Sequence, residues 1–519
     1  MKQIEKNSLL ILTCVIIFTL FFGIGGVPLL DPDEPVYAET AREMIQTGDF
    51  LSPRIFGDYW YDKPPMYYWL VAAAFKVFGY SEFAARFPAA VMGALTAFML
   101  YFSVTKLFNE RAGFWSSMIL TSCIQFFYLS KAAVTDTSLL FFMTGALLSF
   151  LHKKYWLMYV CMGLATLVKG PIGIVFPGII IFLYLLFMGQ LREILRMHVL
   201  RGLLVYLLVA GPWYYLMYIV HGMEFINTFL GFHNVTRFTT PEHASRVTFW
   251  YYFPVVILGL FPWTGLLIQS VKASISDSRI DDMRLLIFMH VWWVFVFIFF
   301  TICKTKLVSY ILPMFPALAI IIGWNISRMM QKMRHNTTFY HWIAGSGIMF
   351  LLLGAGWIVG GQQLPELAFG GMVLGALTLL LGAATVFTLW YYRDIQLAAW
   401  LHVMVGVVTM CVAFAFLLPV VADRFSVKTI SAEYQQQCDQ NTTIYVDKFL
   451  RPGFMYYAGK PGIEMLPKTD AFANALQNGE HKYFLVRGLE YRRLLKTQQQ
   501  PANLHQVTEI ADIYLLEQK

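Results

Sequence analysis

Long apolar runs separated by short polar loops dominate the first 420 residues of the chain. A helix of about 20 apolar residues crosses a bilayer core of roughly 30 Å. The pattern predicts thirteen spans, at 8–28, 82–104, 112–130, 137–151, 155–168, 171–189, 200–221, 249–271, 285–302, 307–327, 340–360, 368–391 and 396–420. A shorter apolar stretch, Met66–Phe78, follows two prolines and predicts a helix that leans in from the membrane interface.

The pattern changes after about residue 421, where the chain becomes polar enough to be soluble. Short apolar runs at Thr442–Asp447 and Lys482–Arg487 predict buried strands. Residues 470–478 and 489–497 predict helices. We therefore expect a transmembrane domain over 1–421 and a small soluble α/β domain over 422–519.

Charge gives the orientation of the predicted spans. Basic residues fall in every second loop, which is the pattern of cytoplasmic loops in membrane proteins. The net charge of +8 therefore does not indicate nucleic-acid binding, and a charged fraction of only 13% excludes an ordinary soluble protein. The opposite, non-cytoplasmic loops include an acidic one at 29–65 and another at 222–248. The odd number of spans places the soluble domain outside the cytoplasm.

Three carboxylates are the candidates for catalysis. Asp33 and Glu34 follow the first span, and Asp136 stands where a later span begins. The simpler interpretation is that Asp33 caps a helix beginning at Glu34-Pro35 and that Asp136 caps the start of its span. Carboxylates at a membrane surface are costly and often functional, so acid–base chemistry or sugar binding is the alternative.

Cations at the same predicted face could hold an anionic phosphate. They are Lys63, Lys169, Lys306, Arg237 and Arg246. Each lysine could also reach the interface without any function. No phosphate-binding glycine motif for a nucleotide occurs, so an activated sugar would have to arrive on a membrane lipid.

A metal site is a weaker candidate. Zinc accepts nitrogen and oxygen ligands, and Asp62 with His233 and His243 could supply them. The spacing fits no closed zinc motif, so solvated loop histidines remain the favoured interpretation. We expect no required cofactor, with a structural zinc ion as the alternative.

Several segments resemble one family in their order along the chain. They are the acidic pair followed by TAREM, then DYWYDKPPMYYWL, FGYSEFAARFPAA, VTDTSLLFF, LVKGPIG, HNVTRF, FWYYFPVVILGLFPW and KLVSYILP, between residues 31 and about 325. Together they resemble the GT-C superfamily of polyprenyl-phosphate-sugar glycosyltransferases. Within it, they are most similar to the bacterial aminoarabinose transferases of lipid A, which are related to protein O-mannosyltransferases.

The resemblance implies a polytopic helical membrane protein of about thirteen transmembrane helices with a GT-C fold and a C-terminal periplasmic α/β domain. It implies transfer of 4-amino-4-deoxy-L-arabinose from undecaprenyl phosphate to lipid A in the bacterial inner membrane, and resistance to cationic peptides such as polymyxin. We expect a monomer that contacts membrane lipids and no nucleic acid.

The resemblance also implies roles for single residues. Asp33 and Asp136 match the family's two outer aspartates, and Lys63 and Tyr310 match residues near the donor phosphate. Asp62 stands where the aminoarabinose enzymes have a glutamate linked to zinc binding, with His233 or His243 as its partner. Val36 replaces an arginine of those enzymes, which leaves room for another sugar.

Other functions stay open at this stage. A protein O-glycosyltransferase would use the same donor chemistry on a serine or threonine. A transporter or lipid flippase would place its ionisable residues near the bilayer midplane, whereas here they gather at one predicted surface. A structural scaffold would not explain the clustered carboxylates and lysines.

Overall fold

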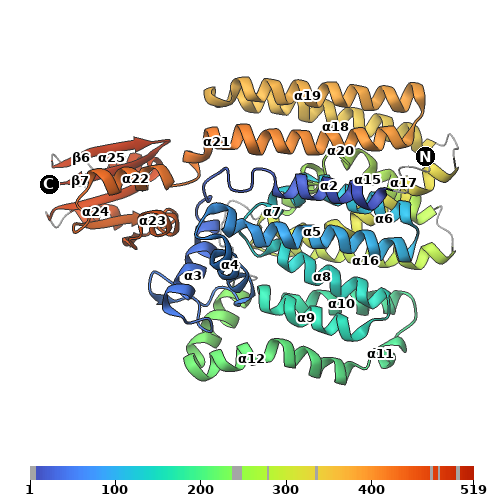
Figure 1. The fold of residues 1–519 in the computed structure, drawn as a ribbon, viewed down its shortest axis with the longest axis horizontal. Coiled ribbons are helices and arrows are strands. Elements are labelled where there is room, and N and C mark those ends of the chain that lie inside the picture. Colours follow the sequence, from blue (N-terminus) through green and yellow to red (C-terminus); the bar gives the residue numbers. More distant parts are fainter. Residues whose placement is uncertain are drawn as a thin grey trace. The chain divides into compact units, whose positions relative to one another are not determined.

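The computed structural model describes residues 7–236, 248–276, 280–332, 337–467, 471–476, 480–497 and 503–519 (Figure 1). The chain forms two compact units. The first comprises Met1–Phe22, Tyr61–Tyr67 and Phe87–Ala413. The second comprises Gly23–Trp60, Tyr68–Arg86 and Phe414–Lys519, so it combines most of the first predicted periplasmic loop with the C-terminal tail.

The first unit is built from helices. They are α2 (Ser8–Phe21), α5 (Glu82–Leu107, whose first turn belongs to the second unit), α6 (Glu110–Ser122), α7 (Ile124–Ser130), α8 (Asp136–Leu151), α9 (Tyr155–Lys169), α10 (Ile172–Phe187), α11 (Glu193–Arg196), α12 (Val199–Ile226), α14 (Tyr252–Gly259), α15 (Thr264–Ser276), α16 (Ile280–Ile302), the 3-10 helix η4 (Val308–Met314), α17 (Phe315–Lys332), α18 (Thr337–Gln362), α19 (Ala368–Phe387) and α20 (Ile395–Val412).

Within the described residues, seven helices are long and apolar enough to cross a membrane, or up to nine if two bent pairs each count as one span. The bent pairs are α6 with α7, at 69°, and α14 with α15, at 103°. We predicted each pair as one straight span, and the structure shows a sharp bend in both. The remaining four predicted spans coincide with the shorter apolar helices α2, α8, α9 and α10.

Small residues let helices of the first unit approach closely. A Cβ added to Gly323 of α17 would lie 2.4 Å from Ser116 Oγ of α6, so only glycine fits there. Lipid tails are as apolar as the side chains, so the hydrophobic effect does not hold helices together in a membrane. Close packing of this kind contributes to their association instead. Three fully buried tryptophans, Trp263, Trp292 and Trp342, fill the same core.

The second unit contains α3 (Asp33–Thr47), the hairpin β1 (Arg54–Ile55) and β2 (Asp58–Tyr59), most of α4 (Met66–Phe78), and the C-terminal domain. The bounds of α4 match the predicted helix. The unit also contains α21 (Leu418–Val421), which is part of the apolar span Ile395–Arg424. The elements of the C-terminal domain are α22 (Lys428–Gln437), β3 (Thr443–Asp447), α23 (Arg451–Ala458), β4 (Ile463–Met465), α24 (Ala471–Leu476), β5 (Lys482–Arg487), α25 (Gly488–Thr497), β6 (Leu504–Ile510) and β7 (Ile513–Gln518).

Five strands form one sheet in the C-terminal domain, in the order β4-β3-β5-β7-β6. The first three are parallel, β7 pairs antiparallel to β5, and β6 pairs antiparallel to β7. Because neighbouring residues of a strand point to opposite faces, Leu485 packs with α22 and α23, whereas Phe484 packs with α24 and α25. The predicted strands and the α/β class of the domain are confirmed.

Candidate active site

Asp33 and Glu34 open helix α3 but have different surroundings. The helix begins at Asp33, and the preceding Pro32 gives no side-chain cap. The predicted N-cap role of Asp33 is therefore wrong, because Asp33 is the first helical residue. Its carboxylate still lies at the positive end of the helix dipole. Asp33 is exposed, whereas Glu34 is buried.

Arg86, near the start of α5, holds Glu34 in place. Its guanidinium contacts both carboxylate oxygens, at 2.8 and 2.6 Å. The remaining N–H groups donate to the carbonyls of Ile24, Val27 and Pro28, at 2.6 to 3.1 Å. All five donors of the arginine are thus used in a pair that is almost fully buried. This geometry favours a positioning role for Glu34 over the predicted catalytic one.

Glu39 is a second buried carboxylate of α3. It is fully buried and forms an ion pair of 2.6 Å with Arg42. Burial raises the pKa of Glu39 from 4.5 to about 7, although the nearby Arg42 guanidinium opposes the shift. Glu39 therefore titrates near neutral pH.

Replacing Glu39 with glutamine should stabilise the protein at about pH 8 and not at about pH 5. The folded protein binds the Glu39 proton more tightly than the unfolded chain does, so this group's contribution to the free energy of unfolding falls as pH rises toward its folded pKa. A shift of this size corresponds to on the order of 3 kcal/mol. Unfolding temperatures of both proteins in detergent across this pH range measure the effect; a pH-independent difference would contradict it.

In the first unit, Asp136 and Lys169 meet directly. Lys169 Nζ lies 2.8 Å from Asp136 Oδ1, and both side chains are largely buried. Lys169 ends α9, and Asp136 is the first residue of α8 after Thr135. The N-cap interpretation of Asp136 is therefore wrong. The Lys169 ammonium also lies 5.4 Å from the centroid of the Tyr310 ring, within the range of a cation–π contact.

The turn that carries Tyr310 is firmly held. Tyr310 belongs to η4, whose carbonyls accept hydrogen bonds from other helices. The Gln125 amide donates to Val308 O at 2.5 Å, and Trp292 Nε1 donates to Pro313 O at 2.8 Å. The structure thus brings together three predicted residues, Asp136, Lys169 and Tyr310, on a rigid support.

Lys306 has a different environment from the predicted one. Its ammonium donates to the carbonyls of Phe300, Thr301 and Cys303, at 2.5 to 3.1 Å, at the C-terminal end of α16. A lysine at this end satisfies unpaired carbonyls and the helix dipole. Burial lowers the pKa of Lys306. Its three donors are used within the protein, so the geometry favours a helix-capping role over phosphate binding.

Lys63 and Asp62 form an adjacent ion pair of 2.9 Å, with both side chains 14% exposed. Next to them, the Tyr61 hydroxyl lies 3.2 Å from Nδ1 of His221, a residue of α12. Within the described residues no group of three or more His, Cys, Asp and Glu side chains could hold a metal ion. Of the three residues of the predicted zinc site, the structure describes the side chain of Asp62, and this side chain is paired with Lys63.

The remaining predicted residues are not placed. Arg237, Arg246 and His243 lie outside the described residues, and for His233 only the backbone is described. Their roles in phosphate or metal binding stay predictions. Asp33 and Glu34 belong to the second compact unit, and Asp136, Lys169, Tyr310, Lys306 and Lys63 belong to the first.

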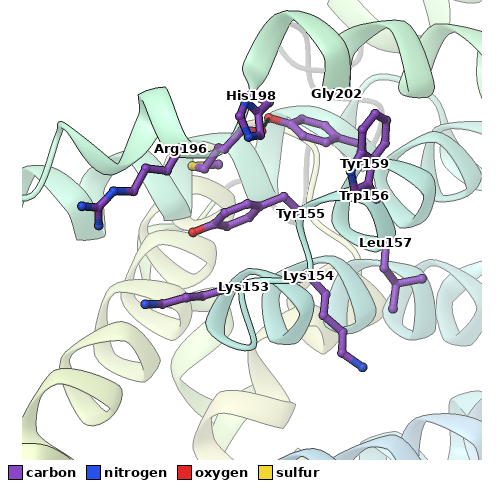
Figure 2. Close-up of a pocket in the computed structure, with 10 residues that line it drawn as sticks. Lys153, Lys154, Tyr155, Trp156, Leu157, Tyr159, Arg196, His198 and Gly202 are labelled. Atoms are coloured by element: carbon purple, nitrogen blue, oxygen red, sulfur yellow. Dashed lines mark hydrogen bonds between the residues drawn. The ribbon is translucent and has the colours of Figure 1, made fainter.

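A pocket of about 520 Å³ in the first unit contains none of these candidates (Figure 2). It is lined by Lys153, Lys154, Tyr155, Trp156, Leu157, Tyr159, Arg196, Met197, His198 and Gly202. Glu193 accepts hydrogen bonds from Tyr155 at 2.6 Å and from Arg196 at 3.0 Å, which neutralises part of its charge. Basic and aromatic residues of this kind are typical of a membrane interface.

Sequence reasoning missed several residues that support the site. Arg86 entered the sequence analysis only as part of the segment FGYSEFAARFPAA. It is, however, the only charged residue in α5 between Glu82 and Lys106. An isolated charge in an apolar helix requires a partner, and that signal could have found it. Asp31, Arg42 and Gly453 gave no such signal, because their partners lie about 400 residues away in the chain.

Comparison with known proteins gives a family model and several relatives. A family model described as dolichyl-phosphate-mannose-protein mannosyltransferase matches residues 62–216. An uncharacterised protein of Aquifex aeolicus is 31% identical over 348 residues, which are 67% of this chain and 78% of the relative. An undecaprenyl phosphate-alpha-4-amino-4-deoxy-L-arabinose arabinosyl transferase of Aeromonas hydrophila is 29% identical over 331 residues, which are 61% of this chain and 60% of that enzyme.

The fold also has a solved counterpart. The crystal structure of ArnT from Cupriavidus metallidurans bound to undecaprenyl phosphate has a TM-score of 0.81 and 22% sequence identity, over 98% of this chain and 97% of that one. The oligosaccharyltransferase of Archaeoglobus fulgidus is more distant, with a TM-score of 0.50 and 12% identity. The fold class predicted from the sequence is therefore confirmed.

Proposed function

Because this chain belongs to the GT-C superfamily of glycosyltransferases that use polyprenyl-phosphate-linked sugars, we propose that it transfers 4-amino-4-deoxy-L-arabinose from undecaprenyl phosphate to a lipid A phosphate. The protein is a multi-pass membrane protein. We place its active site at the periplasmic face of the bacterial inner membrane. There the product would lower the negative charge of lipid A and raise resistance to cationic peptides such as polymyxin.

The observation that carries the proposal is the group formed by Asp136, Lys169 and Tyr310. Lys169 offers a positive charge in a largely buried setting, where an anion is stabilised more strongly than in water. Asp136 and the Tyr310 ring hold the ammonium in one direction. Asp136 takes one N–H of the ammonium, and an ammonium held in this way can donate its other N–H groups to a leaving phosphate that gains charge as a bond breaks.

The reaction is a single displacement at the anomeric carbon of the sugar. An oxygen of the acceptor phosphate forms the new bond to that carbon. The bond to the donor phosphate oxygen breaks, and undecaprenyl phosphate leaves with the electron pair. Lys169, Tyr310 and Lys63 stabilise the leaving phosphate. No step requires a metal ion, and the proposed partners are the two lipids and a surrounding bilayer, with the protein acting as a monomer.

Asp33 takes a role that depends on the acceptor. An ionised phosphate needs no general base, so Asp33 would orient the sugar through its amine. A serine or threonine hydroxyl must lose a proton, and Asp33 would then be the base. In either case replacing Asp33 with asparagine should lower turnover about a hundredfold. Steady-state rates with purified lipid-linked donor measure this, and a near-normal rate would end the catalytic role.

Mass spectrometry of lipid A tests the proposed function directly. The chain is expressed in a bacterial strain that lacks its own aminoarabinose transferase, with an empty vector as the control. An increase equal to one pentosamine unit is expected. An increase equal to the mass of another sugar would mean that the donor carries that sugar and that lipid A is still the acceptor.

The second candidate is a protein O-glycosyltransferase, which the match of residues 62–216 to a protein mannosyltransferase family favours. In that case lipid A would keep its mass and envelope proteins would carry a new sugar. The same cells provide both samples, so one experiment separates the two acceptors.

A further inference from the structure

Asp31, two residues before Asp33, is held by the C-terminal domain. Its carboxylate accepts hydrogen bonds from the backbone N–H groups of Val427 and Gly453, each at 3.0 Å. Its own N–H donates to Phe425 O at 2.7 Å. Val427 precedes α22, and Gly453 lies in the first turn of α23. One carboxylate therefore satisfies the N-terminal ends of two helices.

Gly453 leaves space for this contact. A Cβ added at position 453 would lie 2.3 Å from Asp31 Oδ1, far inside the distance that real contacts allow. Any other residue would have to push the Asp31 carboxylate away from α23.

Helix α3 also contacts the opposite end of α23. Arg42 donates to the carbonyls of Tyr456 at 2.8 Å and Met455 at 3.0 Å, and its guanidinium lies 5.1 Å from the Tyr456 ring centroid. The Tyr457 hydroxyl lies 2.8 Å from Leu29 N and accepts its hydrogen bond. The segment 29–42 is thus attached to both ends of an eight-residue helix of the C-terminal domain.

We propose that the C-terminal domain is a positioning element for the reaction, and that Asp31 and Gly453 set the place of Asp33 through this attachment. The inference rests on the proposed function and on the catalytic role of Asp33. Asp33 lies between Asp31, which α22 and α23 hold, and Glu34, which Arg86 holds. Only Pro32 separates Asp31 from Asp33, so a shift of Asp31 displaces the short segment that carries Asp33.

The kinetic test uses Gly453→Ala. A misplacement of about 1 Å can lower a rate by up to about a hundredfold, so we expect turnover to fall at least about tenfold, with the KM for the donor within about twofold. Gly178→Ala is the matched control, because a Cβ at this helical glycine meets no atom within 4 Å. Asp31→Ala should match Gly453→Ala. Asp439→Ala should have no effect, because it removes a carboxylate that accepts hydrogen bonds from Asn441 N and Thr442 Oγ1 in its own turn.

A double variant shows whether the effect acts through Asp33. If it does, Gly453→Ala should lower turnover in the wild-type background and leave the low rate of Asp33→Asn unchanged. Equal losses in both backgrounds would overturn the proposal, because they would mean a general loss of folded enzyme. A wild-type rate for Gly453→Ala would also overturn it.

A distance measurement decides the matter without any enzyme activity. Spin labels are placed on cysteines at Asp33 and at the exposed Gln436 of α22, with the exposed Cys14 replaced by serine. A narrow distance distribution is expected, and Gly453→Ala should broaden or shift it. An unchanged distribution would overturn the inference. If the wild-type protein transfers no sugar, the proposed function fails and the labels still report on the attachment.

Discussion

Replacing Lys169 with methionine is expected to lower kcat/KM for the lipid-linked donor by about two to three orders of magnitude. Methionine keeps most of the length of the side chain and removes the charge, so the loss measures the contribution of the ammonium, including its pairing with Asp136. Lys169 is 16% exposed and paired with Asp136, and its ammonium lies over the Tyr310 ring. Initial rates with purified donor and acceptor lipids, at saturating and limiting donor, give kcat and KM separately.

Lys306→Met is the contrasting variant. Lys306 is also a buried lysine of the first unit, but its donors satisfy three backbone carbonyls. Loss of the Lys306 ammonium should lower the unfolding temperature, because the three carbonyls that it caps lose their donor. The rate per folded molecule should stay almost unchanged. Equal kinetic losses in the two variants would contradict the assignment. So would a Lys169→Met enzyme that keeps a tenth or more of its rate.

The two lysines show what the sequence could and could not predict. Both stand at outer ends of apolar runs beside glycine, proline or aromatic residues, so both read as phosphate ligands. Their difference depends on how the chain folds back after each helix. After α16 the chain folds back, so that the Lys306 ammonium donates to Cys303 O at the end of that helix. The Lys169 ammonium instead pairs with the carboxylate of Asp136, 33 residues earlier in the chain. Periodicity carries no information about such pairings.

The same limit applies to the fold. Spans and two tail strands were predictable because hydrophobic runs of suitable length are local signals. The strands β6 and β7 have mixed polar and apolar residues and were missed. The joining of residues 23–60 with the tail was also missed, since it rests on single contacts such as Asp31 with Gly453. Among the candidate residues, Tyr310 came from the resemblance to a family and not from the local pattern.

Replacing Arg86 with methionine is expected to destabilise the second unit by about 3–5 kcal/mol. The change would remove the guanidinium from the buried Glu34 carboxylate and the Arg86 donors from three carbonyls. Taking one partner from a buried ion pair is far more harmful than removing an exposed pair, since an uncompensated charge remains in a poorly solvated place. Hydrogen exchange of peptides from residues 23–60 should rise sharply, and its protection gives the free energy of local opening.

A double variant and a surface control separate the contributions of the ion pair and of the carbonyl hydrogen bonds to this loss of stability. Arg86→Met with Glu34→Met removes both charges, so part of the stability should return, while the orphaned carbonyls of Ile24, Val27 and Pro28 keep the recovery incomplete. Arg54→Met breaks a pair with Asp49 whose side chains are 28% and 29% exposed, and it should cost no more than about 1 kcal/mol. If Arg86→Met were as mild as Arg54→Met, the pair would be unimportant for holding Glu34. The segment that places Asp33 would then depend on its contacts with the C-terminal domain through Leu29, Asp31 and Arg42.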